Sequence, residues 1–130
     1  MLAVDRDPHA LAGLDGVAGV TTAQHDLERG GWPLGGENFA GIVVCRYLHR
    51  PLLPFVAGAL APGGVLIYET FMAGNAAYGR PSRPDFLLQP GELLSFAQAQ
   101  GLEVLDFVEG FVADPKPAMM QAICARRGAA

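Results

Sequence analysis

Residues 39–71 read FAGIVVCRYLHRPLLPFVAGALAPGGVLIYETF, and this stretch decides the fold. It contains two unbroken apolar runs, Ile42–Cys45 and Val65–Tyr68. Such runs are typical of strands in a parallel sheet that helices cover on both faces. Between them, apolar residues recur at helical spacing: Leu52, Phe55, Val56, Ala59 and Leu60. Because Pro62-Gly63-Gly64 ends that helix, the stretch predicts a strand-helix-strand crossover.

A tripeptide follows each of the two predicted strands: Arg46-Tyr47-Leu48 and Glu69-Thr70-Phe71. In open parallel sheets, ligands bind beyond the carboxyl ends of the strands. We therefore expect functional side chains in these two tripeptides.

The composition limits the possible functions. The 130 residues carry a net charge of −4, and the nine Lys and Arg form no patch, so nucleic acid is not an expected partner. No apolar run approaches the roughly 20 residues that span a bilayer, and the N-terminus lacks the layout of a secretion signal. We expect one cytoplasmic domain over residues 1–130, without membrane attachment. The Cys and His residues share no metal-ligand spacing, so no metal is expected.

The N-terminal part predicts a second strand-helix-strand unit. Met1–Val4 reads as a strand ending on Asp5, and Asp7-Pro8 begins a short helix over residues 8–14. Val17–Ala23 is rich in β-branched residues and reads as the next strand.

The C-terminal part predicts a different arrangement. Met72–Gln89 has no periodicity and is long for a connection, which is typical of a lid. A helix is predicted from Pro90 to Gln100. Two strand-like segments, Leu102–Val112 and Ala118–Arg126, then follow closely enough for antiparallel pairing.

Four motifs in this order resemble the later two-thirds of a class I S-adenosylmethionine-dependent methyltransferase. They are LAVDRD at 2–7, QHDLERGGWPL at 24–34, FAGIVVCRYLHR at 39–50 and LAPGGVLIYETF at 60–71. Residues 68–126 look most like small tellurite-resistance-type methyltransferases. The resemblance implies an α/β fold, with a Rossmann-like mostly parallel sheet, helices on both faces and a C-terminal antiparallel strand pair. It also implies S-adenosylmethionine as methyl donor and a small-molecule acceptor.

The resemblance implies a donor site. Asp5, with Arg6 beside it, holds the position of the acid that binds the ribose hydroxyls, and a carboxylate can accept both protons. Asp26 holds the position that meets the adenine amine, followed by the backbone amide of Leu27. Arg46 and Tyr47 should pass near the sulfonium, where carbonyls and an aromatic face favour positive charge. Simpler roles stay open: a helix cap for Asp5 and Asp7, a solvated turn for Asp26 and packing for Tyr47.

Methyl transfer requires alignment and desolvation more than a dedicated base. The catalytic candidates are Tyr47, His49 and Glu69, and the substrate candidates are Glu69, Tyr78 and Arg80. Surface variation explains the substrate candidates equally well, and His49 also fits a solvated or helix-start residue. The sequence does not identify the methyl acceptor.

The resemblance also shows what the 130 residues lack. The family begins with a strand, a D-x-G-x-G loop and a helix, and none of these occurs here. We expect a fragment of a protein about 50 to 80 residues longer. Removal of that strand would leave its two neighbours about 9.5 Å apart with bare edges. Loss of the loop would remove about 3 to 9 kcal/mol of donor binding, or at least about two orders of magnitude in affinity.

Two alternatives follow from these gaps. One is a non-catalytic remnant that pairs its exposed strands with a partner or a second copy, as an interaction or dimerisation module. The other is a nicotinamide-binding domain, in which Asp5 would also bind a ribose. It requires the same absent glycine loop and leaves Asp26 unexplained.

Overall fold

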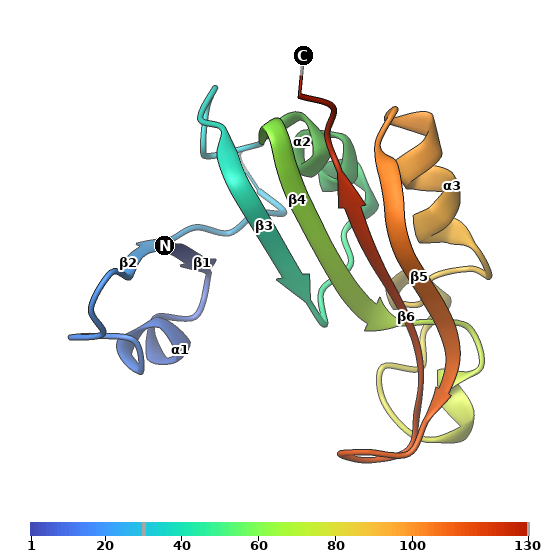
Figure 1. Cartoon of the computed structure of the whole chain (residues 1–130). Coiled ribbons are helices and arrows are strands. Elements are labelled where there is room, and N and C mark those ends of the chain that lie inside the picture. The colour runs from blue at the N-terminus through green and yellow to red at the C-terminus, as the bar shows by residue number, and fades with distance from the viewer. Residues whose placement is uncertain (30, 130) are drawn as a thin grey trace. The chain divides into compact units, whose positions relative to one another are not determined.

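The computed structural model describes residues 1–29 and 31–129. The chain divides into two compact units, Met1–Gly35 and Gly36–Ala130, each with its own sheet (Figure 1). The first sheet pairs β1 with β2, and the second has the strand order β3-β4-β6-β5. The expectation of one domain over the whole chain stays a prediction.

The first unit is the strand-helix-strand arrangement expected from its sequence. β1 (Leu2–Asp5) and β2 (Thr21–Gln24) are parallel, and α1 (Pro8–Ala12) connects them. Asp7 caps α1 by accepting a hydrogen bond from the amide of His9 at 2.8 Å. The predicted helix start is therefore confirmed.

The strand predicted over Val17–Ala23 is shorter than expected. It begins only at Thr21, because Gly16 and Gly19 have φ angles of 79° and 78° and turn the chain there. The amide of Val20 donates to the Val17 carbonyl within this turn.

The second unit confirms both the crossover and the antiparallel strand pair. β3 (Phe39–Cys45) runs parallel to β4 (Leu60–Phe71), with a short 3₁₀ turn η1 (Arg50–Leu52) and α2 (Leu53–Gly58) between them. After α3 (Glu92–Ala99), β5 (Glu103–Val112) and β6 (Ala118–Arg126) form an antiparallel pair. β6 also pairs antiparallel with β4, so β5 is an edge strand. The α/β Rossmann-like fold class is confirmed.

Gly64, in the first part of β4, lies too close to neighbouring backbone oxygens to carry a side chain. A Cβ at this position would lie 2.8 Å from the carbonyl oxygen of Ala61 and 2.9 Å from that of Phe39. The ladder shifts register next to this point, between Phe39 and Gly41. A side chain at position 64 would therefore separate β3 from β4.

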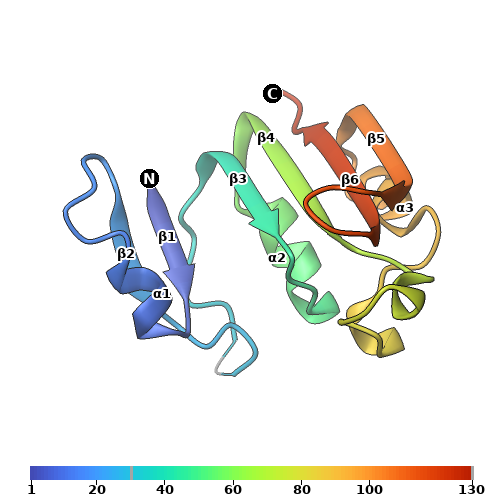
Figure 2. The ribbon, with the colours of Figure 1, turned by 90° about the horizontal axis from the view of Figure 1, so that it is seen from below.

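Helices α2 and α3 both pack on one face of the four-stranded sheet (Figure 2). Burial consequently alternates along β4, where Leu66, Tyr68 and Thr70 are buried and Ile67 and Glu69 are exposed. The unbroken apolar run predicts cover on both faces, but in this unit, over the residues described, the cover lies on one. Of the apolar residues at helical spacing, Phe55 is 51% exposed, whereas Leu52 and Val56 are buried.

β3 is the other edge strand of its sheet. The amide of Arg46 donates to the carbonyl of Glu69, so alternate backbone groups of β3 face β4. Those of Gly41, Val43 and Cys45 face away from β4. Within the second unit, over the residues described, β3 therefore pairs on one side only, with β4.

We predict that Gln121→Met destabilises the protein by about 2 to 4 kcal/mol, because it leaves buried groups unsatisfied. The buried Gln121 side chain accepts from the Leu93 amide at 2.7 Å and donates to the Gln89 carbonyl at 3.0 Å and to Glu109 at 2.9 Å. Urea denaturation measures the change. The exposed Gln98→Met on α3 is the control, expected to change the free energy of unfolding by less than about 0.5 kcal/mol. An equally small effect at Gln121 would contradict this account.

Candidate functional site

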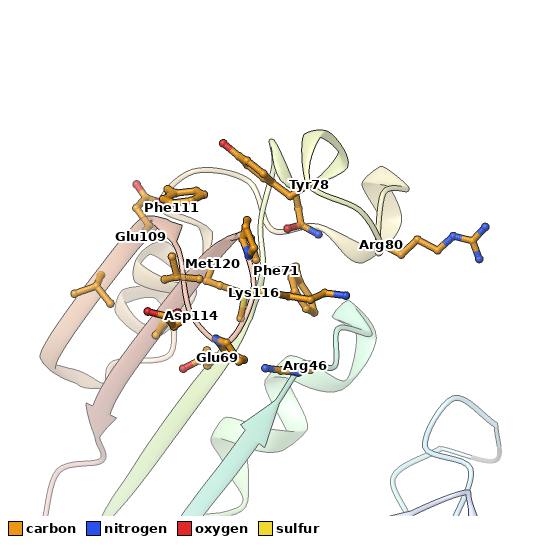
Figure 3. Close-up of a pocket in the computed structure, with 18 residues that line it drawn as sticks. Arg46, Glu69, Phe71, Tyr78, Arg80, Glu109, Phe111, Asp114, Lys116 and Met120 are labelled. Carbon is orange, nitrogen blue, oxygen red and sulfur yellow. The ribbon is translucent and has the colours of Figure 1, made fainter.

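A cavity of about 570 Å³ lies at the carboxyl end of β4, wholly within the second unit (Figure 3). Its walls come from the residue after β3, the end of β4, the segment 72–89 and the β5–β6 hairpin. The charged and aromatic side chains that line it are Arg46, Glu69, Phe71, Tyr78, Arg80, Glu109, Phe111, Asp114 and Lys116. This is the end of the sheet at which function was predicted.

Arg46 enters the cavity through a strained backbone. Its φ of 53° makes it the single non-glycine residue with positive φ among those described. A left-handed residue with a side chain costs about 1 to 2 kcal/mol, and such strain is common at functional sites. Its guanidinium lies 6.0 Å from the centre of the Phe71 ring, in a cation–π contact.

The acidic residues that line the cavity differ in their hydrogen bonds to the rest of the protein. Glu109 accepts from the Gly91 amide at 3.0 Å and from Gln121 at 2.9 Å, so it helps to hold α3 in place. The side chains of Glu69 and Asp114 have no such hydrogen bonds within the described part of the chain. These two carboxylates are available to a ligand.

Segment 72–89, predicted to be a lid, is held to the rest of the second unit by several hydrogen bonds. It contains two 3₁₀ turns, η2 (Asn75–Ala77) and η3 (Pro84–Phe86). The buried Asn75 donates to the Pro81 carbonyl at 2.9 Å and accepts from the Met119 amide at 3.0 Å. The amide of Leu88 also donates to the Phe71 carbonyl. The segment is thus a fixed wall of the cavity in this structure.

Arg50, the first residue of η1, binds the C-terminal part of segment 72–89 and the start of α3. Its guanidinium donates to both carboxylate oxygens of Glu92, at 2.7 and 2.9 Å, and to the carbonyls of Asp85 and Leu87. The bond to Arg50 lowers the pKa of Glu92, and the same bond raises the pKa of Arg50.

Tyr68 fixes the chain that follows Arg46. Its buried hydroxyl donates to the carbonyl of Tyr47 at 2.6 Å, and burial raises the pKa of this phenol well above its usual value. The phenol therefore remains a neutral hydrogen-bond donor at physiological pH. This bond orients the backbone between β3 and η1.

The structure gathers part of the predicted site in this cavity. Arg46, Glu69, Tyr78 and Arg80 all line it, whereas Tyr47 and His49 are half-buried side chains outside its lining. The roles assigned to these residues stay predictions.

Asp5, Arg6, Asp26 and Leu27 lie in the first unit, at or just after the carboxyl ends of β1 and β2. One carboxylate oxygen of Asp5 accepts from the Asp7 amide at 3.0 Å, and the other has no hydrogen bond or ion pair within the described residues. Asp26 accepts from the Glu28 amide at 3.0 Å and lies 3.7 Å from Arg29. The exposed Asp5 and the half-buried Asp26 are chemically suited to the hydroxyls and amine of a nucleoside.

Sequence reasoning missed the contribution of the β5–β6 hairpin. Asp114-Pro115-Lys116-Pro117 reads as a turn, but its side chains line the cavity together with Phe111 and Met120. The predicted antiparallel pair was the one feature of the sequence that could have placed this hairpin at the cavity. Once β6 pairs with β4, the hairpin must lie at the carboxyl end of β4.

The described residues contain no group of three or more metal-ligating side chains, and none of their helices is long and apolar enough to cross a membrane.

No protein-family model and no curated protein sequence matches the chain. Solved structures match its fold. A methyltransferase from Mesorhizobium loti that depends on S-adenosylmethionine superposes with a TM-score of 0.72 at 18% identity, over 97% of this chain and 79% of that one. The N-methyltransferase NodS from Bradyrhizobium japonicum gives 0.68 at 18% identity, over 98% and 72%.

The [4+2]-cyclase SpnF matches with a TM-score of 0.71 at 13% identity, over 99% of this chain and 66% of SpnF. The chain thus has the fold of class I S-adenosylmethionine-dependent methyltransferases and spans roughly two-thirds to four-fifths of these structures. The same fold serves a cyclase, so the fold alone does not fix the reaction.

We predict that Glu92→Gln lowers the free energy of unfolding at pH 7 by about 1 kcal/mol, because the ion pair with Arg50 is partly exposed. The pKa of Glu92 is lowered in the folded state, so its contribution is present above the ordinary Glu pKa of about 4.3 and is lost as the pH falls through the folded-state value. The difference between the two proteins should therefore shrink below about pH 4. Urea denaturation between pH 3 and 7 measures it.

The control for this experiment is Glu103→Gln. Glu103 pairs with Arg126 at 2.7 Å on an exposed part of the sheet, so its removal should change the free energy of unfolding little at any pH. A pH-independent difference for Glu92→Gln would contradict the assigned role of the ion pair.

Proposed function

We propose that the chain is the larger part of an S-adenosylmethionine-dependent methyltransferase that acts on a small molecule. The observation that carries the proposal is the cavity at the carboxyl ends of β3 and β4, in a chain with a methyltransferase fold. This is the position at which open parallel sheets bind ligands. The cavity, at about 570 Å³, lies within the size range of sites for small molecules.

The residues of the first unit suit the nucleoside of the donor. Asp5 would accept the ribose hydroxyls, and Asp26 the adenine amine, with Arg6 and the Leu27 amide beside them. S-adenosylmethionine supplies a methyl group on a positively charged sulfonium. The carbonyl of Tyr47, which Tyr68 orients, is a suitable partner for that charge.

The second unit would supply the acceptor side. An acceptor lone pair forms a bond to the methyl carbon while the carbon–sulfur bond breaks, which leaves a neutral thioether. Alignment of the two reactants supplies much of the rate enhancement in such a displacement. Glu69 is the cavity carboxylate nearest to Arg46 along the ladder and could take the proton that the acceptor loses.

The absence of a D-x-G-x-G motif from the 130 residues bears on their affinity for the donor. That loop would grip the charged methionine end. We therefore propose that these residues alone bind the donor with an affinity at least about two orders of magnitude lower than a chain that contains the loop. Their methyltransferase activity should be correspondingly low.

A second candidate function follows from the edge of β3. Val43 is 66% exposed there, and the backbone groups of Gly41, Val43 and Cys45 face away from β4. Such an edge is a template for another strand. The alternative is a non-catalytic module that pairs β3 with a second copy, as a homodimer, or with a partner.

We predict that Asp5→Asn weakens the binding of S-adenosylmethionine by about tenfold, because it removes a charged acceptor of the ribose hydroxyls. Isothermal titration calorimetry measures the affinity. Asp7→Asn is the matched control, since asparagine also caps a helix and Asp7 has no proposed contact with the donor. A screen of small nucleophiles with a radiolabelled methyl donor then tests transfer.

Size-exclusion chromatography of the same samples separates the two functions. A monomer whose donor binding depends on Asp5 supports the methyltransferase. A dimer that ignores the donor at millimolar concentration would overturn that proposal in favour of the interaction module.

A further inference from the structure

We propose that the cavity selects an anionic acceptor, a small organic acid with an aromatic or apolar body and a hydroxyl or amine nucleophile. The inference rests on the proposed function, since it names the substrate class of the same site. It depends on how charge is distributed around the cavity.

The charges of the cavity are separated into two sides (Figure 3). Asp114 lies on the side of β5 and β6 and Glu69 lies on β4, whereas the charged ends of Arg46 and Lys116 lie toward β3 and segment 72–89. Arg80 extends outward from the same basic side. A ligand that spans the cavity therefore meets positive charge at one end and carboxylates at the other.

Neither of the two inward cations, Arg46 and Lys116, is ion-paired within the described residues, whereas Arg50 and Arg126 each form an ion pair. Guanidinium is the side-chain group best suited to grip a carboxylate, through two parallel hydrogen bonds. The basic side is thus ready to receive an anion.

Arg46 is better suited to the acceptor than to the donor. A sulfonium is positively charged, so a guanidinium close to it would oppose binding. The strained backbone at Arg46 turns its side chain over Phe71, into the cavity. Such strain at a ligand-facing arginine indicates a role in binding rather than in folding.

The surfaces between the two charged sides are apolar. Phe71, Met120, Val108 and Val112 line the cavity, and Tyr78 and Phe111 form an aromatic pair with ring centres 5.2 Å apart. An aromatic or apolar body would bury its surface here. With its carboxylate on Arg46 and Lys116, its far end would meet Glu69 or Asp114, which accept hydrogen bonds from a hydroxyl or an amine.

Three isosteric probes test the charge preference without any methyl donor: 4-hydroxybenzoate, 4-hydroxybenzamide and 4-hydroxybenzamidine. Their dissociation constants for the 130-residue chain can be measured by ligand-observed NMR. We expect the anion to bind most tightly, the neutral amide about tenfold more weakly or worse, and the cation most weakly.

Arg46→Gln should abolish the preference for the anion, with benzoate binding about 10- to 100-fold weaker. Arg83→Gln is the matched control. It removes the same charge from segment 72–89, but Arg83 pairs with Asp85 and does not line the cavity. This control should keep the preference.

Arg46→Gly keeps the test valid if Arg46→Gln folds poorly. Glycine adopts positive φ without strain, so this variant should melt at the same temperature as the original chain or higher while losing the anion preference. Circular dichroism melting provides the second readout.

The proposal would be overturned by tighter binding of the amidine, by an anion preference that survives Arg46→Gly, or by no binding of the benzoate at 10 mM. These outcomes are distinct from failure of the proposed function. Binding of the benzoate through Arg46 without any methyl transfer would support the anion site and count against the methyltransferase. Methyl transfer only to neutral or cationic acceptors would support the methyltransferase and count against the anion site.

Discussion

The parallel pairing of β3 with β4 is the constraint on which the rest of the structure depends. It places Cys45 opposite Glu69, so the Arg46 amide donates to the Glu69 carbonyl where β3 ends. The pairing in turn needs Gly64, where any side chain would meet two carbonyl oxygens. Because both strands end at the same edge of the sheet, the residues after them line one cavity.

The antiparallel strand β6 completes the cavity on one face of the sheet and anchors α3 on the other. It returns along β4, so its hairpin with β5 brings Asp114 and Lys116 back to the carboxyl end of the sheet. On the opposite face, Gln121 of the same strand binds α3, and Tyr68 of β4 binds the chain before η1. The covered face holds α2 and α3, whereas the open face contributes residues to the cavity.

Much of the fold could be predicted from local signals, because unbroken apolar runs, helix caps and the Pro-rich turn each have a local physical cause. Arg46, Glu69, Tyr78 and Arg80 were found because they follow strands or interrupt periodicity. The hairpin residues were missed, because no local pattern tells which strand β6 joins. Helical spacing groups Phe55 with Leu52 and Val56, but it does not show that Phe55 is exposed on the short helix α2. The strain at Arg46 is likewise a tertiary effect.

Chemical-shift mapping of S-adenosylmethionine on the ¹⁵N-labelled chain tests the central claim most directly. The claim is that residues after β1 and β2 bind the nucleoside of the donor, that the chain after β3 binds its sulfonium, and that the cavity of the second unit binds the acceptor. The account predicts shifts of the amides of Arg6, Leu27 and Tyr47, with little change in α3. Shifts confined to α3 and the covered face, or none at 10 mM donor, would contradict it.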